Sequence, residues 1–156
     1  QCGQVFKAVE RNFDYTLWAW MKNVPDPWTF DYNRDFPSPD KTHKVVYEHL
    51  IEVAMGAPLR GDGYLETEDK RRIKIHDSCG GPPVWHTSGK MVALPIWTYG
   101  KGQRMGVVDL TEMNLKIFSE PCGVLDIESF DKTVIDLGFK KFDIKKKSID
   151  WVIKLA

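Results

Sequence analysis

The stretch MVALPIWTYGKGQRMGVVDL, residues 91–110, decides the fold that the sequence predicts. It opens with an apolar run, passes through the glycine-containing segment GKGQ, and continues in a second run that ends in VVDL. Two such runs joined by a short glycine turn are typical of an antiparallel β-hairpin. Pro95 cannot donate a backbone hydrogen bond, so we expect its strand to lie at an edge or to be bulged.

Further short strands are predicted on both sides of this hairpin. The run RRIKIHD precedes it, and LKIF, CGVLDIE and KTVIDLGF follow at short spacing. The last run, IDWVIKL, alternates so that Trp151 shares one face with apolar residues, which predicts a strand with one buried side. Residues 57–156 therefore predict about seven short antiparallel strands that form a curved sheet or a partly open barrel.

Two segments near the N-terminus show helical spacing instead. In residues 5–22, apolar side chains recur every three or four positions, although the second half also alternates as a strand would. In residues 41–55, Asp40 is a good N-cap, and Gly56 is a good stop signal. We therefore expect two N-terminal helices on the sheet. This predicts one α+β domain over residues 1–156, with a helical part at 1–56 and a β part at 57–156.

An aromatic and proline-rich loop is predicted at residues 24–40. Its four prolines oppose both helix and inner strand, yet it carries several large rings. The rings either seal an edge of the core or form a surface that faces a partner. In the second interpretation, the contact residues are Trp28, Phe30 and Tyr32, with Trp85 from a neighbouring loop.

Charge is balanced over the chain but unevenly placed. The 156 residues have a formal net charge of zero, which argues against a protein that grips nucleic acid with its whole surface. Residues 1–40 carry four basic and six acidic groups, whereas residues 138–156 carry six lysines and two aspartates. This polarity suits self-association or a charged partner. Lys145, Lys146 and Lys147 in a predicted hairpin are a candidate contact, or they protect a sheet edge from aggregation.

The segment HDSCGGPPVWH, residues 76–86, holds the main candidates for chemistry. His76, Cys79 and His86 are ligand types that zinc accepts, but no second ligand pair accompanies them, so no metal and no cofactor are expected. Cys79 before two glycines could instead act as a nucleophile, with either histidine as its base. The alternative, which we favour, is a turn built from glycine and proline without chemistry.

One further acid–base candidate lies in the predicted second helix. His49 and Glu52 are three positions apart and can share a helix face, which would suit proton transfer in a pocket lined by the sheet. A histidine on an apolar face is also a common structural residue.

The number of cysteines and the first residue of the chain are relevant to the cellular compartment of the protein. The chain has three cysteines, Cys2, Cys79 and Cys122. Because this number is odd, at least one thiol is unpaired or bonded to another chain. Gln1 stands where an initiator methionine would, which favours secretion or import into an organelle after removal of a leader. No apolar run reaches the roughly 20 residues that a transmembrane helix needs.

Together these features favour a non-catalytic binding or interaction protein, for example a subunit of a larger assembly. Its partner would be a protein or a small ligand, in a homo- or hetero-oligomer, with nucleic acid disfavoured. Two alternatives stay open. One is a small secreted enzyme, either a hydrolase that uses the 76–86 loop or an acid–base lyase or isomerase that uses His49. The other is a carbohydrate-binding protein with an aromatic platform.

Overall fold

The computed structural model describes residues 26–98 and 102–155, and in these residues the chain forms strands and turns but no helix. The described part therefore also contains no helix that could span a membrane. The strands are β1 (Phe36–Pro37), β2 (His43–Ile51), β3 (Arg60–Thr67), β4 (Arg72–Cys79), β5 (Val84–Trp85), β6 (Met91–Thr98), β7 (Gly102–Asp109), β8 (Asn114–Phe118), β9 (Ser129–Asp131), β10 (Val134–Asp136), β11 (Lys141–Asp143) and β12 (Ile149–Lys154).

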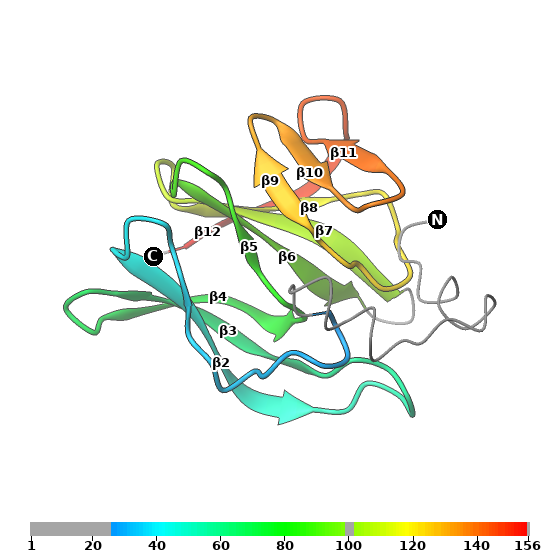
Figure 1. Cartoon of the computed structure of the whole chain (residues 1–156), viewed down its shortest axis with the longest axis horizontal. Helices are drawn as coiled ribbons and strands as arrows, with labels where there is room; N and C mark the ends of the chain where they lie inside the picture. Colours follow the sequence, from blue (N-terminus) through cyan, green and yellow to red (C-terminus); the bar gives the residue numbers. More distant parts are fainter. Residues whose placement is uncertain (1–25, 99–101, 156) are drawn as a thin grey trace.

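The strands form two antiparallel sheets. The larger sheet has the order β1-β2-β3-β4-β6-β7-β8-β12, with β5 paired to β6, and the smaller has the order β11-β10-β9. The large sheet turns sharply between β4 and β6, which share a single residue pair, Cys79 with Ile96. Figure 1 shows the two halves of this sheet diverging at that point, with the small sheet above them.

The hairpin predicted at residues 91–110 is confirmed. β6 and β7 pair in continuous register from Met91 with Asp109 to Thr98 with Gly102. The expectation that Pro95 lies in an edge strand or at a bulge is wrong. Pro95 lies inside the sheet, in continuous register with β7, where β6 changes its other neighbour from β5 to β4. Its carbonyl accepts the Gly80 N–H at 2.8 Å. In an antiparallel strand, the backbone N and C=O of one residue face the same side. The N–H that Pro95 lacks would therefore point toward Gly80 and away from β7, so the pairing of β6 with β7 loses no hydrogen bond.

The helix predicted at residues 41–55 is wrong, because most of this segment is strand β2. Val45, Val46 and Tyr47 are all buried, on both faces of a strand that lies between β1 and β3. β-branched and aromatic residues buried on two faces favour a strand. Asp40, the predicted helix N-cap, is instead a turn residue. Its carboxylate accepts hydrogen bonds from Ser38 and Thr42 just before β2.

The α+β class must be corrected accordingly. The described residues are all-β, with two antiparallel sheets. The other predicted helix, at residues 5–22, lies outside the described residues. The predicted strand at CGVLDIE is also absent, since this segment makes only one isolated bridge, Gln103 with Cys122.

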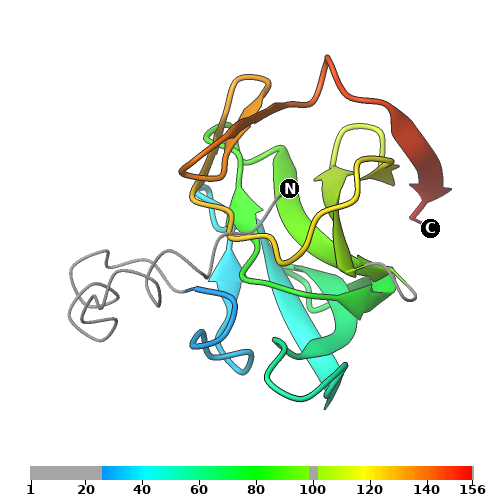
Figure 2. The ribbon, with the colours of Figure 1, turned by 90° about the vertical axis from the view of Figure 1, so that its right-hand side faces the viewer.

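Two apolar cores hold these layers together. One lies between β2–β4 and β6–β8 and includes Val45, Leu65 and Leu94. The other lies on the opposite face of β6–β8, where Met105 and Val107 pack with the small sheet. Figure 2 shows the small sheet on one side of the central strands and β2–β4 on the other, with β12 at the right-hand edge, where it continues the large sheet beside β8.

Candidate interaction surface

Cys79 ends β4 in the middle of the first core. Its side chain is fully buried, and the free thiol donates to the His76 carbonyl at 3.4 Å. Burial raises the pKa of this thiol to about 12. Since the thiolate is both the nucleophile and the metal ligand, this geometry favours a structural cysteine.

Both histidines of the 76–86 segment are held by backbone groups. His76 Nδ1 accepts the Ser78 N–H at 3.0 Å, and burial lowers the pKa of His76. His86 Nδ1 accepts the Ser88 N–H at 2.9 Å, while its Nε2 lies 2.8 Å from the Lys132 carbonyl and therefore donates to it. His86 thus ties the turn before β6 to the small sheet. No cluster of three potential metal ligands occurs within residues 26–98 and 102–155.

Gly81 makes room for two aromatic side chains. A Cβ on Gly81 would lie 2.5 Å from Phe30 Cζ and 2.8 Å from the Tyr47 hydroxyl. That hydroxyl donates to the Gly80 carbonyl at 2.7 Å. Gly81 therefore lets the aromatic loop approach the backbone. The turn interpretation of HDSCGGPPVWH holds only for residues 80–83, because His76–Cys79 belong to β4 and Val84–Trp85 form β5.

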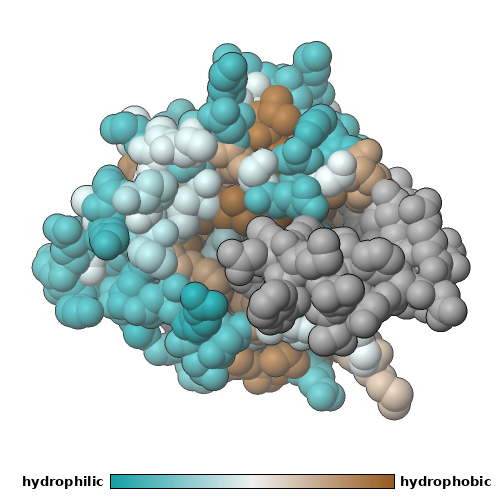
Figure 3. Space-filling model, in the orientation of Figure 1, coloured by the Kyte–Doolittle hydropathy of each residue, from teal (hydrophilic) through white to brown (hydrophobic). Residues whose placement is uncertain are grey.

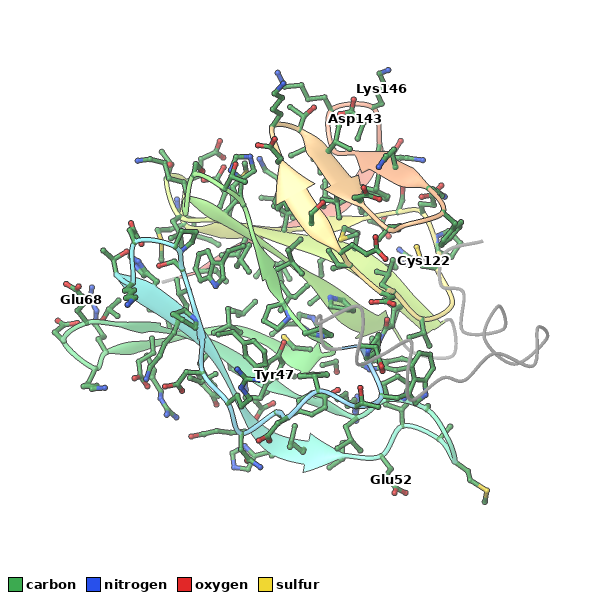
Figure 4. The ribbon with its side chains drawn as sticks, in the orientation of Figure 1. Tyr47, Glu52, Glu68, Cys122, Asp143 and Lys146 are labelled. Atoms are coloured by element: carbon green, nitrogen blue, oxygen red, sulfur yellow. The ribbon has the colours of Figure 1, made fainter. Side chains whose placement is uncertain are left out.

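The aromatic loop packs onto the sheet. Phe30 and Tyr32 are each 7% exposed, and their ring centroids lie 3.9 Å apart. The Tyr32 hydroxyl donates to the Leu59 carbonyl at 2.7 Å. Trp85 is half-buried and donates its indole N–H to the Phe36 carbonyl at 2.9 Å. Figure 4 shows Tyr47, a member of this aromatic cluster, pointing into the fold. Of the predicted contact residues, Phe30 and Tyr32 thus lie inside the core.

His49 lies on the surface and does not face Glu52 across a helix. It adopts a positive φ of 53° at an irregularity of β2, and its Nδ1 lies 2.8 Å from an oxygen of Asp62. Glu52 is exposed in the loop that follows β2. The pair predicted for acid–base catalysis is therefore not assembled.

The β2–β3 loop is one exposed apolar surface. Ile51, Val53 and Met55 are exposed by 47%, 41% and 102%. Trp28 is half-buried beside them and donates its indole N–H to the Gly56 carbonyl at 2.9 Å. Figure 3 shows apolar surface at the lower edge of the molecule, where Figure 1 places the end of β2 and this loop.

The predicted lysine contact forms the turn between β11 and β12. Lys145 and Lys146 are exposed, and no ion pair joins either to another described residue. Lys147 is half-buried, because it pairs with Glu120 at 3.0 Å and lies 5.4 Å from the centre of the Phe142 ring. Figure 4 shows Lys146 and Asp143 at the tip of this turn, at the opposite end of the molecule from Glu52.

β12, which follows this turn, is the second exposed apolar surface. Ile149, Trp151 and Val152 are exposed by 45%, 53% and 59%. The expectation that Trp151 lies on a buried face is therefore wrong, although Ile153 is half-buried and Leu155 is buried. The overlooked signal in the sequence was Val152, an apolar residue on the face assigned to solvent.

The outer edge of β12 carries backbone groups that no described strand pairs with. β12 pairs with β8, and no described strand pairs with its other side. The Leu155 N–H donates inward to the Met113 carbonyl at 2.9 Å. Since backbone groups alternate in direction along an antiparallel strand, the N–H and C=O groups of Val152 and Lys154 point outward.

Arg104, in strand β7, makes a cation–π contact with the exposed Trp151. Its guanidinium carbon lies 5.7 Å from the centre of the indole ring, and it pairs with Asp150. Asp150 lies at a bulge of β12 between Ile149 and Trp151. We define the β12 surface as Lys145, Lys146, Ile149, Trp151, Val152 and Lys154.

Comparison of the chain with models of protein families, with curated proteins and with solved structures found no match.

Proposed function

We propose that this protein is a non-catalytic interaction domain that binds an extended polypeptide segment along β12. The observation that carries the proposal is a strand edge that no described strand pairs with and that also exposes three apolar side chains. A strand edge recognises a peptide by main-chain hydrogen bonds, and side chains at alternate positions add specificity. Natural sheets usually protect such edges, so this exposure favours a partner.

The placement of the candidate catalytic residues supports a binding role. Cys79 is buried with a raised pKa, and His76 and His86 are held by backbone groups. His49 is exposed and paired with Asp62. The β2–β3 loop is also apolar, but its exposed residues 53–56 form bends and turns and offer no strand edge.

The lysine turn indicates the charge of the partner. Lys145 and Lys146 lie immediately before β12 and lack ion-pair partners among the described residues. They would receive carboxylates that flank the bound segment. The preferred peptide is therefore extended, with apolar side chains at alternate positions and acidic residues beside them.

The test is binding of fluorescently labelled eight-residue peptides, measured by polarisation. One set alternates valine or isoleucine with glutamate, and a second set carries lysine in place of glutamate. We expect the acidic set to bind more tightly. Val152→Pro removes an outward N–H and should weaken binding by about tenfold or more.

Two control variants make the result specific. Lys132→Glu changes an exposed lysine in the β9–β10 turn, and Met55→Lys changes the other apolar surface. Both should bind as the natural chain does. Absence of binding by either peptide set, or equal binding by Val152→Pro, would contradict the proposal.

A further inference from the structure

We infer that the edge of β12 distinguishes the two faces of the segment that it binds, and that Lys116 and Lys154 select acidic side chains on one of them. This rests on the proposed function and names the specificity of the same site. Acidic side chains of the segment lie on the face of Lys116, and apolar side chains lie on the face of Trp151. The inference holds for either direction of the bound segment, because side chains alternate between the two faces of any strand.

The pairing of β12 with β8 assigns each side chain to a face. Val152 pairs with Lys116 in the regular part of β12 that follows the bulge. Paired residues share a face of the sheet, and so do residues two positions apart along a strand. Lys116, Val152 and Lys154 therefore lie on one face, which we call the lysine face. Trp151 and Ile153 lie on the opposite face, which we call the tryptophan face.

The lysine face carries positive charge that is not balanced by ion pairs in the described part of the chain. Lys116 is half-buried and Lys154 is exposed, and neither forms an ion pair within residues 26–98 and 102–155. Lys154 Nζ donates to the Glu112 backbone carbonyl at 3.5 Å, whereas the Glu112 carboxylate accepts the Asn114 amide N–H at 3.0 Å. Such a face favours carboxylates of a partner.

The tryptophan face differs, because the cation beside it is already neutralised. The Arg104 guanidinium carbon lies 5.7 Å from the centre of the Trp151 ring, and Arg104 pairs with Asp150. Asp150 lies at the bulge of β12, so its carboxylate is used within the chain. This face exposes 53% of Trp151 beside the half-buried Ile153, which favours apolar side chains of a partner.

Both lysines can reach a segment that is paired with β12. Neighbouring strands lie about 4.8 Å apart, so Lys154 meets a cross-strand neighbour directly. Lys116 lies one strand further away, roughly 10 Å from the bound segment. Only the short side chain of Val152 lies between them, and the aliphatic stem of Lys116 can lie over it. An acidic side chain opposite Val152 therefore has a cation on either side.

The test compares three sets of labelled peptides by fluorescence polarisation. Two are the acidic and basic sets described above, and a neutral set carries glutamine in place of glutamate. Lys116→Met and Lys154→Met keep an aliphatic stem but remove the charge. We expect each variant to bind the acidic set about two- to fivefold more weakly, the range of an exposed ion pair. The neutral set should bind as it does to the natural chain, which also shows that the variants are folded.

Charge reversal gives a larger effect. Lys116→Glu combined with Lys154→Glu should lower the ratio of acidic to basic peptide affinity by about tenfold or more, because attraction becomes repulsion at two positions. Lys132→Met in the β9–β10 turn is the matched control and should leave all three affinities unchanged. Trp151→Leu acts on the other face and should weaken all three sets by the same factor.

These results separate the specificity from the proposed function. If Lys116→Met and Lys154→Met weaken the acidic and neutral sets equally, or leave the preference for the acidic set intact, the inference is overturned. If Val152→Pro still abolishes binding in that case, the strand-binding function stands, and the preference belongs to Lys145 and Lys146. If no peptide set binds the natural chain, both proposals fall.

Discussion

Gly81 shows how one residue connects the aromatic loop to the sheet. An added Cβ would meet Phe30 Cζ at 2.5 Å, and this ring is packed against Tyr32 and Tyr47 and cannot retreat freely. Gly81→Ala should therefore lower the free energy of unfolding by about 1–3 kcal/mol, the usual cost of overpacking a core. Urea unfolding followed by tryptophan fluorescence measures it.

The matched control for this variant is Gly56→Asn. Gly56 has a positive φ of 77° with no atom within 4 Å of an added Cβ, and asparagine tolerates that conformation. We expect this variant to change stability by less than about 0.5 kcal/mol. If Gly81→Ala were as stable as Gly56→Asn, the tight seat of Phe30 against the 80–81 backbone would be wrong.

The same residues show what sequence can and cannot give at this scale. Two adjacent glycines predicted a turn, because glycine chemistry is local. That Gly81 admits Phe30 and Tyr47 depends on residues 51 and 34 positions away in the chain. Whether Cys79 and His76 can act chemically likewise depends on how deeply they are buried, and a short motif does not reveal burial.

At the scale of elements, β12 should respond differently to proline at adjacent positions. The Val152 N–H points outward, whereas the Ile153 N–H points toward β8, two residues before the inward bond of Leu155. We expect Val152→Pro to cost less than about 1 kcal/mol of stability. Ile153→Pro breaks a ladder bond and should cost about 3 kcal/mol or more.

Urea unfolding followed by tryptophan fluorescence checks this difference. Equal destabilisation by the two prolines would mean that the outward direction assigned to the Val152 N–H is incorrect. The strand-addition mechanism would then lose its geometric basis, since that mechanism needs this donor at the free edge.

The elements also show why sequence interpretation succeeded at one place and failed at another. The 91–110 hairpin could be predicted because its two strands and its turn are contiguous. For residues 41–55, the signals at Asp40 and Gly56 serve turns as well as helix ends. Residues 43–51 form a strand rather than a helix because Val45 and Tyr47 are buried against other strands, and this burial is not a local property of the sequence.

At the scale of the whole molecule, the exposure of β12 could not be derived from its own residues. IDWVIKL predicts a strand, but its place at the end of the sheet follows from the pairing order of the other strands. The opposite charge of residues 1–40 and 138–156 predicts association, and this stays a prediction. The lysines of the second segment lie beside the edge of β12 that no described strand pairs with. The partner itself was beyond sequence reasoning.

Stability of the whole molecule should fall in two steps as the pH is lowered. Burial lowers the pKa of His76 below 6.5, so its contribution is present above about pH 6.5 and is lost as the pH falls, when the unfolded chain takes up the proton first. Arg72 and Lys44 lower the pKa of Glu66 below 4.5. That contribution is present above this value and is lost as the pH falls toward the folded pKa.

Urea midpoints between about pH 8 and pH 3 should resolve the two steps through two variants. His76→Asn keeps an oxygen that can accept the Ser78 N–H but cannot titrate, so the first step should shrink. Glu66→Gln removes the carboxylate that Arg72 holds at 2.8 Å, so the second step should shrink while the first remains. If His76→Asn left the first step unchanged, the buried neutral state of His76 would not be what stabilises the fold near neutral pH.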